Sequence, residues 1–449
     1  MTDKQTEERP ERVPYEAKRA GELCALSADR QDRWGWVEPS VWTERMLTAL
    51  EVGVEGSKWY SLMDKVYSLA NLRSAFARVK ANGGSSGVDH QTIEGFEDHL
   101  EENLGNLAQT LKDGTYRPQA VRRVWIDKLG SSEKRPLGIP AVRDRVAQGA
   151  VRHVLEPIFE RDFAEQSYGF RPGRGCKDAL RRVDELLRTG YVWVVDVDLK
   201  SYFDTIPHEP LLERVRKKVS DGRVLDLLKA YLNQKVMDGL KDWTPEAGSP
   251  QGAIISPLLS NIYLDPLDHA MVQWGYVMVR YADDSVILCR SQAEAERALE
   301  KMRCWTAMAG LTLHPEKTRI VDATQSGGFD FLGYHFERGM KWPRKKSLEK
   351  FREAIRAKTR RANGRSLEAT IVEVNRTLVG WFEYFKHSDP LTFRIQDGWI
   401  RMRLRSILRQ RHGRTGIGHG LDHFRWPNAF FAKQGLFSLM SAHAQYVNP

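Results

Sequence analysis

The stretch Val277-Met-Val-Arg-Tyr-Ala-Asp-Asp-Ser-Val-Ile-Leu-Cys289 places two neighbouring carboxylates, Asp283 and Asp284, between two short apolar runs. Apolar runs of this length around a polar centre predict a β-hairpin with the acidic pair at its tip. Adjacent like charges repel, so a cation is needed to keep both carboxylates ionised. Mg²⁺ suits this place because it binds one or two carboxylates together with substrate phosphates. An ordinary acidic turn is the alternative, since Asp is common in turns.

A second apolar stretch, Tyr191-Val-Trp-Val-Val-Asp-Val-Asp198, predicts a buried strand that is interrupted by Asp196 and Asp198. Residues two apart on a strand share a face, and a buried carboxylate is costly unless it is paired or metal-bound. A pair of metal ions about 3.5–4 Å apart needs a third carboxylate from elsewhere in the chain, for which Asp196 and Asp198 are the candidates. The alternative is that these aspartates cap the following helix, a role that suits Asp204 better than metal binding. Whether Asp196 assists the metal site or only balances charge stays open.

Asp198-Leu-Lys-Ser-Tyr-Phe-Asp204, followed by Tyr281-Ala-Asp-Asp284, resembles the catalytic core of reverse transcriptases. Further motifs occur in the order seen in group II intron-encoded proteins, and the ordered set is far more specific than any single member. These motifs are Arg135-Pro-Leu-Gly-Ile-Pro140, Ser167-Tyr-Gly-Phe-Arg-Pro-Gly-Arg174, Gly248-Ser-Pro-Gln-Gly252, Gly310-Leu-Thr-Leu-His-Pro-Glu-Lys-Thr318 and Phe331-Leu-Gly333. The resemblance runs from about residue 72 to the C-terminal tail.

The resemblance implies an α+β fold of the right-hand polymerase type. Its expected parts are an N-terminal extension (1–65), fingers and palm (66–338), a helical thumb or domain X (339–415), and a tail that contacts DNA or packs on the body (416–449). It also implies an RNA-directed DNA polymerase that copies intron RNA into cDNA from a DNA primer and deoxynucleoside triphosphates. Asp198, Asp283 and Asp284 would hold two Mg²⁺ ions. We expect the span after Gly333 to be helical through about Arg411, because it lacks strand alternation.

The family's nucleotide pocket maps onto five positions of this sequence. Lys128 and Arg135 flank a short loop of an expected fingers hairpin, where they would hold the incoming triphosphate; the family usually has Ile-Pro-Lys where this chain has Ile126-Asp127-Lys128. Phe203 would exclude a 2′-hydroxyl, although a core phenylalanine is a strong alternative. Gln251 and Gly252 would contact the base, with the glycine allowing close backbone approach; the alternative is an ordinary turn before a helix.

The basic charge of the chain is localised. Net charge is +10, and residues 341–414 contain 20 Lys or Arg against 7 Asp or Glu, so the remainder is slightly acidic. A block of this kind predicts contact with a phosphate backbone rather than general solubility, although a solvated helical surface is the alternative. Four aromatic residues lie within the block at 381–385, where they either stack on RNA bases or form core. In group II proteins the corresponding region binds intron RNA and supports splicing, which implies a maturase.

Composition sets further expectations. No run of about 18 or more apolar residues suggests a membrane span, the first residues lack an apolar signal core, and the four cysteines are scattered. We therefore expect a cytoplasmic protein. The last hundred residues contain no cysteine, so we expect no His-Asn-His endonuclease and a resemblance to the endonuclease-lacking proteins of bacterial group II introns, which act on target DNA.

Two other functions remain open on sequence grounds. One is a domesticated group II-like reverse transcriptase in DNA repair or phage defence. The other is an RNA-binding splicing factor with an idle polymerase site, against which the three intact aspartates argue.

Overall fold

The computed structural model describes residues 33–54, 58–127, 134–361 and 364–448. Two compact units are present. One comprises the chain up to residue 119 together with 140–162 and 215–231, and the other comprises 120–139, 163–214 and the chain from residue 232 onward. No helix in the described ranges is both long and apolar enough to cross a membrane.

The first unit is helical. Its helices are α2 (Glu44–Val52), α3 (Met63–Val66), α4 (Leu69–Asn82), α5 (Ile93–Glu97), α6 (Leu100–Asp113), α7 (Val142–Glu160) and α11 (Gly222–Leu232). Helix α4 buries Leu72, Phe76 and Val79, a spacing that gives it one apolar face. That face packs on α7, which is buried along nearly its whole length and forms the centre of the unit. After α4 the chain continues in a glycine- and serine-rich loop, Gly83-Gly-Ser-Ser-Gly87.

A polar network crosses this helical core. The Asn71 amide nitrogen donates to the backbone carbonyls of Lys65 (2.9 Å) and Ala150 (3.1 Å). The Asn71 amide oxygen therefore faces Nδ1 of His153, 2.8 Å away, and Nδ1 carries the proton because an amide oxygen only accepts. The Trp42 indole donates to the His153 carbonyl at 2.9 Å. Burial of the ring lowers the pKa of His153 from 6.5 to about 4, so the imidazole is neutral in the folded protein.

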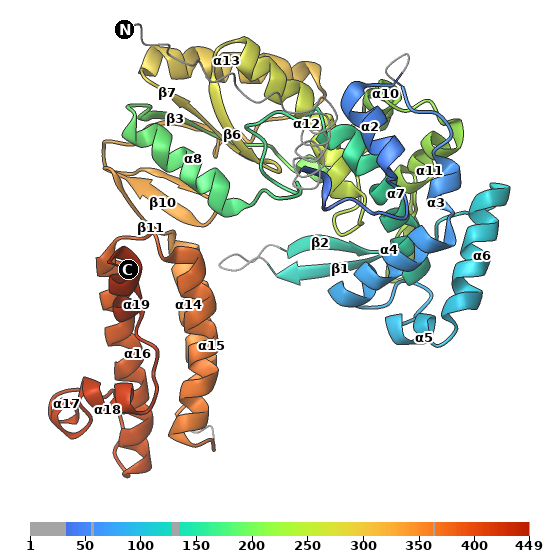
Figure 1. Cartoon of the computed structure of the whole chain (residues 1–449). Helices are drawn as coiled ribbons and strands as arrows, with labels where there is room; N and C mark the ends of the chain where they lie inside the picture. Colours follow the sequence, from blue (N-terminus) through green and yellow to red (C-terminus); the bar gives the residue numbers. More distant parts are fainter. Residues whose placement is uncertain (1–32, 55–57, 128–133, 362–363, 449) are drawn as a thin grey trace, which may run out of the picture. The chain divides into compact units, whose positions relative to one another are not determined.

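The second unit is built around a four-stranded antiparallel sheet in the order β6-β7-β3-β8 (Figure 1). Its strands are β3 (Trp193–Asp198), β6 (Val277–Tyr281), β7 (Asp284–Cys289) and β8 (Arg319–Asp322). The predicted strand and acidic hairpin are thus confirmed. Helix α13 (Gln292–Met308) covers one face, while α8 (Cys176–Arg188) and a small sheet cover the other. Helices α9 (Tyr202–Thr205), α10 (His208–Arg216) and α12 (Ser256–Gln273) connect the strands.

A second sheet has the order β2-β1-β4-β5. Strands β1 (Val121–Asp127) and β2 (Lys134–Ile139) form the predicted hairpin, in which Ile126 lies opposite Arg135. Strand β4 (Val236–Asp238) runs parallel to β1 and carries the short edge strand β5 (Lys241–Trp243).

The helical prediction for the residues directly after Gly333 is wrong. They form a hairpin of β10 (Tyr334–Glu337) and β11 (Met340–Pro343), which joins β9 (Phe329–Phe331) in a three-stranded sheet. The hairpin forms because Arg338 and Gly339 both adopt positive φ in a tight turn. Tyr334 and Phe336 then alternate with more exposed residues and enter the core beside α8.

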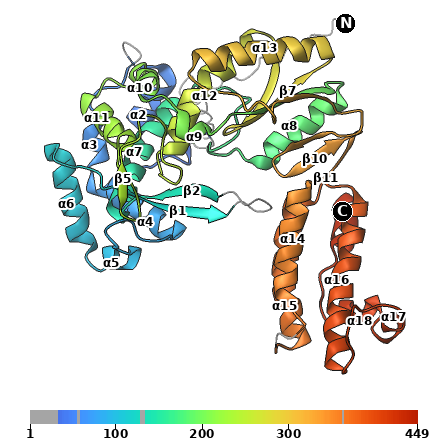
Figure 2. The same ribbon diagram turned by 180° about the vertical axis from the view of Figure 1, so that it is seen from behind.

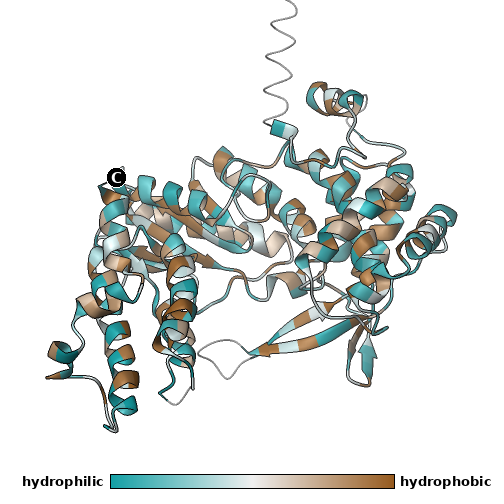
Figure 3. Cartoon of the chain, turned by 60° about the horizontal axis from the view of Figure 1, so that its bottom comes forward, coloured by the Kyte–Doolittle hydropathy of each residue, from teal (hydrophilic) through white to brown (hydrophobic). Residues whose placement is uncertain are grey.

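The region that follows is a helical bundle (Figure 2), as predicted. Its helices are α14 (Lys345–Lys358), α15 (Leu367–Phe385), α16 (Pro390–Arg411), α17 (Asp422–Arg425), α18 (Asn428–Lys433) and α19 (Leu439–Val447). The core interpretation of the aromatic cluster is confirmed, because Phe382 and Phe385 are buried and Trp381 stacks on Phe351 at 4.3 Å between ring centroids. Figure 3 shows hydrophobic and hydrophilic residues on different sides of these helices. Tail residues such as Phe431 complete the core.

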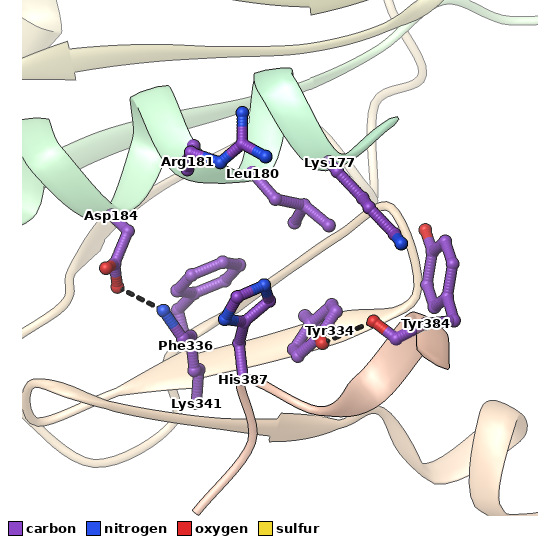
Figure 4. A pocket seen from close by; sticks show the side chains of 9 residues that line it. All are labelled: Lys177, Leu180, Arg181, Asp184, Tyr334, Phe336, Lys341, Tyr384 and His387. Carbon is purple, nitrogen blue, oxygen red and sulfur yellow. Dashed lines mark hydrogen bonds and ion pairs between the residues drawn. The ribbon is translucent and has the colours of Figure 1, made fainter. Parts of the chain in front are cut away.

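A small cavity lies among α8, the β10–β11 hairpin and the end of α15 (Figure 4). Beside it, Lys341 Nζ lies 2.6 Å from a carboxylate oxygen of Asp184. The Tyr334 hydroxyl donates to the Tyr384 carbonyl at 2.8 Å, and the Tyr384 hydroxyl donates to the Leu332 carbonyl at 2.7 Å. These reciprocal bonds fasten α15 to the small sheet.

The buried imidazole of His153 makes stability depend on pH. Its folded-state pKa lies below the ordinary value, so the unfolded chain binds the extra proton between these values. The contribution of the neutral His153 imidazole to the free energy of unfolding is therefore complete above about pH 6.5, and it is lost as the pH falls toward 4. Between pH 7.5 and pH 5 we expect it to account for about 2 kcal/mol of unfolding free energy. Urea unfolding of wild type and His153→Gln at both pH values checks this; equal pH dependence in the two proteins would contradict it.

Candidate active site

Pairing of β3 with β7 brings the predicted carboxylates together. Asp198, the last residue of β3, lies directly opposite Asp284, the first residue of β7. Directly opposite residues of an antiparallel pair share a face, so these two side chains point to the same side of the sheet. Asp283 precedes Asp284 in the turn, where Ala282 adopts a φ of 59°. The local sequence forms the hairpin, and the long-range pairing with β3 supplies the third carboxylate.

The three aspartates line a cavity of about 680 Å³. Its charged lining residues are the carboxylates of Asp196, Asp198, Asp283, Asp284, Glu316 and Asp330, and the cationic groups of Arg135, Lys317, Arg319 and Arg344. Six carboxylates therefore face four cations. Such a cavity attracts further positive charge.

Burial and mutual repulsion make the aspartates hard to ionise together. Burial, followed by the charges of Asp196 and Asp283, raises the pKa of Asp284 to about 7. Burial also raises the pKa of Asp283, with Asp198 adding to the effect. The pKa of Asp196 rises to about 6 through burial, which Arg319 partly offsets. A cation placed among these groups would relieve the repulsion.

Two cationic side chains from the segment around β8 already pair with the aspartates of β3. Lys317 Nζ lies 2.9 Å from Asp198 Oδ2, and Arg319 Nε lies 3.5 Å from Asp196 Oδ2. Asp196 thus has a charge-balancing partner within the cavity. Across the described ranges, no three acidic, histidine or cysteine side chains stand close enough together to hold a metal ion. The donor set nonetheless fits one, because carboxylate oxygens are the ligands that Mg²⁺ prefers.

Of the two predicted triphosphate ligands, Arg135 lines the cavity, and Lys128 lies outside the described residues. Arg135 Nε donates to the Gln251 side-chain oxygen at 2.8 Å, which links β2 to the turn before α12. The same turn is held from the backbone, because the Gly138 amide donates to the Gln251 carbonyl at 2.6 Å. Gly252 has a φ of 111°, and a Cβ at this position would lie 2.3 Å from the Gly138 carbonyl oxygen. The close approach that this glycine permits is therefore to the backbone of β2.

Phe203 does not line the aspartate cavity. It is buried in α9, where its ring lies 5.4 Å from that of Tyr202 and 6.5 Å from that of Phe170. It faces a neighbouring cavity of about 240 Å³, which it lines together with Asp204 and the turn at Gly248. Asp204 lies within α9 rather than at its N-cap, so the capping prediction for Asp204 is wrong.

Arg280 was not identified from the sequence, yet it organises the hairpin. Its side chain is fully buried, with Nε donating to Asp268 Oδ1 at 2.7 Å and Nη2 to Oδ2 of the same carboxylate. Nη1 donates to the Asn261 side-chain oxygen (3.0 Å) and to the Ala282 carbonyl (2.8 Å) in the turn that carries Asp283. Nη2 also donates to the Ser167 hydroxyl oxygen at 2.7 Å. The available signal was a charged residue within an apolar strand, the reasoning already applied to Asp196.

Arg344 was also missed. It lines the aspartate cavity, and its charge opposes the rise in the pKa of Asp284. Its Nε is buried without a hydrogen-bond partner.

The mixed helix and strand fold, with Asp198, Asp283 and Asp284 at the joined ends of β3 and β7, is consistent with the palm of a right-hand polymerase. Residues 126–336 match the reverse transcriptase (RNA-dependent DNA polymerase) family, and residues 348–425 match the group II intron, maturase-specific domain. The chain belongs to the reverse transcriptases that carry this group II intron maturase domain.

Individual relatives agree. The group II intron-encoded protein LtrA of Lactococcus lactis subsp. cremoris is 40% identical over 201 residues, which cover 44% of this chain and 33% of LtrA. Protein YkfC of Escherichia coli (strain K12) is 35% identical over 293 residues, covering 56% of this chain and 76% of YkfC. The match to LtrA thus spans only a third of that protein. Among solved structures, a chain of a partial Cas6-RT-Cas1–Cas2 complex has a TM-score of 0.36 and 22% identity, covering 55% of this chain and 42% of that chain.

Replacing Arg280 tests how far the fold depends on the buried ion pair between Arg280 and Asp268. Arg280→Met leaves the Asp268 carboxylate buried without its partner, so we expect a loss of about 3–5 kcal/mol in unfolding free energy. Chemical unfolding measures this value. The double variant Arg280→Met, Asp268→Leu removes both charges and should recover most of the loss. Wild-type stability in the single variant would show that the pair is not a principal support of the fold.

Proposed function

We propose that the protein is an RNA-directed DNA polymerase that copies group II intron RNA into cDNA. The primer 3′-hydroxyl attacks the α-phosphate of a deoxynucleoside triphosphate and releases pyrophosphate. The observation that carries the proposal is the register that sets Asp198 against Asp284 in one cavity with Asp283. Asp198, Asp283 and Asp284 would hold two Mg²⁺ ions, which when bound stabilise charge on the attacking and leaving oxygens.

The remaining residues of the site are proposed to position the nucleotide. Arg135, fixed by its bond to Gln251, would hold the triphosphate together with Lys128. Gln251 and Gly252 would border the base, and the Phe203 ring would exclude a 2′-hydroxyl from the sugar site. Phosphoryl transfer depends mainly on this kind of positioning and charge stabilisation.

Asp283→Asn tests the polymerase directly. Loss of a ligand carboxylate should lower primer extension on an RNA template by more than about a hundredfold, while RNA binding stays close to wild type. Extension of a labelled DNA primer with Mg²⁺ and deoxynucleotides measures the first, and filter binding measures the second. Asp322→Asn is the matched control, because Asp322 belongs to the same sheet but pairs with Thr324 instead of lining the cavity. Extension that survives in Asp283→Asn would refute the assignment.

We further propose that the helical bundle binds intron RNA and supports splicing as a maturase. The buried aromatic residues at 381–385 contribute core, so the basic residues carry the interaction. Around Trp399 lie the guanidinium groups of Arg352, Arg356 and Arg403, with Cζ to ring-centroid distances of 5.5–5.8 Å. Arginines stacked on an indole combine phosphate attraction with a fixed geometry.

Arg356→Gln tests the RNA surface. Removing one phosphate contact should weaken intron RNA binding and reduce the slope of log affinity against log salt by about 0.7–0.9. Extension on a short unrelated template should not change. Titration of labelled intron RNA at several salt concentrations measures the slope. Lys358→Gln is the control on the same helix, because Lys358 already pairs with Glu373 at 3.6 Å. Equal slopes in wild type and Arg356→Gln would refute the proposed contact.

We propose that the chain is organised as an N-terminal extension (1–65), fingers and palm (66–338), a helical thumb (339–415) and a tail (416–449). The tail would contact target DNA as a further partner. We place the protein in the cytoplasm, where its RNA and nucleotide substrates would be available. The free thiols of Cys176, Cys289 and Cys304 suit a reducing compartment.

A further inference from the structure

One face of the β2-β1-β4-β5 sheet carries a stack of two tryptophans and an arginine. Arg123 and Trp125 are two residues apart on β1 and share a face. Trp243 on β5 reaches the same face, because it lies opposite Val236, which in turn lies beside Val121. The Arg123 Cζ lies 4.7 Å from the Trp243 ring centroid and 5.6 Å from that of Trp125. We call Trp125, Arg123 and Trp243 the tryptophan platform.

The platform is exposed and yet fixed. Trp125 is 46% exposed and Trp243 is 38% exposed, which is unusual for two large aromatic side chains on one short sheet. The Trp125 indole donates to the Asp238 carboxylate at 3.0 Å, and Arg123 holds both rings by cation–π contact. The Trp125 ring is thus fixed by a hydrogen bond and by Arg123, and the Trp243 ring by Arg123, while both side chains stay partly exposed to water. Rings held in this way can accept a flat ligand at little cost in conformational entropy.

The platform continues into the cavity of about 240 Å³ that Phe203 borders. Arg123 and Trp243 form part of its wall, and Ser249 and Pro250 form another part. Ser249 and Pro250 directly precede Gln251, a candidate base-contacting residue. A nucleic-acid strand that approached the proposed nucleotide pocket through this cavity would therefore pass the tryptophan platform before it reached the site of copying.

We propose that the tryptophan platform stacks the unpaired bases of the RNA template that have not yet been copied. This inference rests on the proposed polymerase function. Aromatic side chains beside arginine are the usual means of holding single-stranded nucleic acid, and stacking tolerates every base because each has a π face. A surface that holds the template of a polymerase requires this tolerance, since templates of every sequence must be copied. Arg123 adds attraction for the phosphates.

The experiment compares binding of two primer–template duplexes to the full-length protein without deoxynucleotides. One duplex is blunt, and the other extends the RNA template by four unpaired nucleotides at its 5′ end. We expect the extension to tighten wild-type binding by about tenfold, and Trp243→Ala and Trp125→Ala to remove most of that gain. Trp243→Phe should retain part of it. Fluorescence anisotropy of the labelled primer measures each affinity.

Trp274→Ala is the matched control. Trp274 is 37% exposed and has Lys301 Nζ 5.5 Å from its ring centroid, but it lies at the end of α12, away from the platform sheet. This variant should keep the full effect of the extension. Thermal unfolding checks that the alanine variants remain folded, and blunt-duplex binding should be the same in all of them.

The outcomes separate the two proposals. In one outcome the wild type synthesises DNA on the primer while the four unpaired template nucleotides give no gain in affinity, or a gain that Trp243→Ala does not reduce. Either result is compatible with the proposed polymerase function and overturns the role of the tryptophan platform. A change in oligomeric state on Trp243→Ala, measured by light scattering and without loss of the extension effect, would identify a protein contact that includes the exposed Leu240 and would also overturn it. If the wild type neither binds nor extends either duplex, the proposed function and the platform fail together.

Discussion

The buried guanidinium of Arg280 is the constraint on which the β6–β7 hairpin depends. Its bonds to Asp268 join β6 to α12, and its bond to the Ala282 carbonyl fixes the turn that presents the aspartates. A buried charge of this kind is tolerated only when its donors are satisfied, and Arg280 meets this condition through groups from separate segments of the chain. The turn is consequently defined by tertiary contacts and not by the hairpin sequence alone.

Around this fixed turn, the cavity balances opposing electrostatic demands. Asp283 and Asp284 lie close enough to repel each other, and cations that entered the cavity would offset this repulsion by attracting both carboxylates. Lys317 and Arg319 reduce the repulsion by pairing with the aspartates of β3. The arrangement keeps the carboxylates near one another while limiting the electrostatic strain on the sheet.

Local patterns in the sequence predicted the strands and the acidic hairpin, because short apolar runs and a polar tip are signals within one segment. The partnership of Asp198 with Asp284 needed the resemblance to known polymerases, since strand pairing between distant segments leaves no local pattern. The β10–β11 hairpin was missed because its strands are only four residues long and its turn begins with an arginine. The pairing of Lys317 with Asp198 depends on the path of the chain into β8, which pairs with β3. The spacing of apolar residues in the sequence does not reveal this path. The metal-ligand and nucleotide-pocket roles themselves stay predictions.

The contact between Gly138 and Gly252 also limits how this protein can change over evolutionary time. A methyl group at position 252 would overlap the Gly138 carbonyl oxygen, and one at position 138 would lie 2.6 Å from a methyl group of Val121. A side chain at position 252 would therefore part the turn at Gln251 from β2, whereas one at position 138 would meet the side chain of Val121 on β1. Sequence variation around this joint is thus confined to neighbouring positions, whose side chains can change while the two backbones stay in contact.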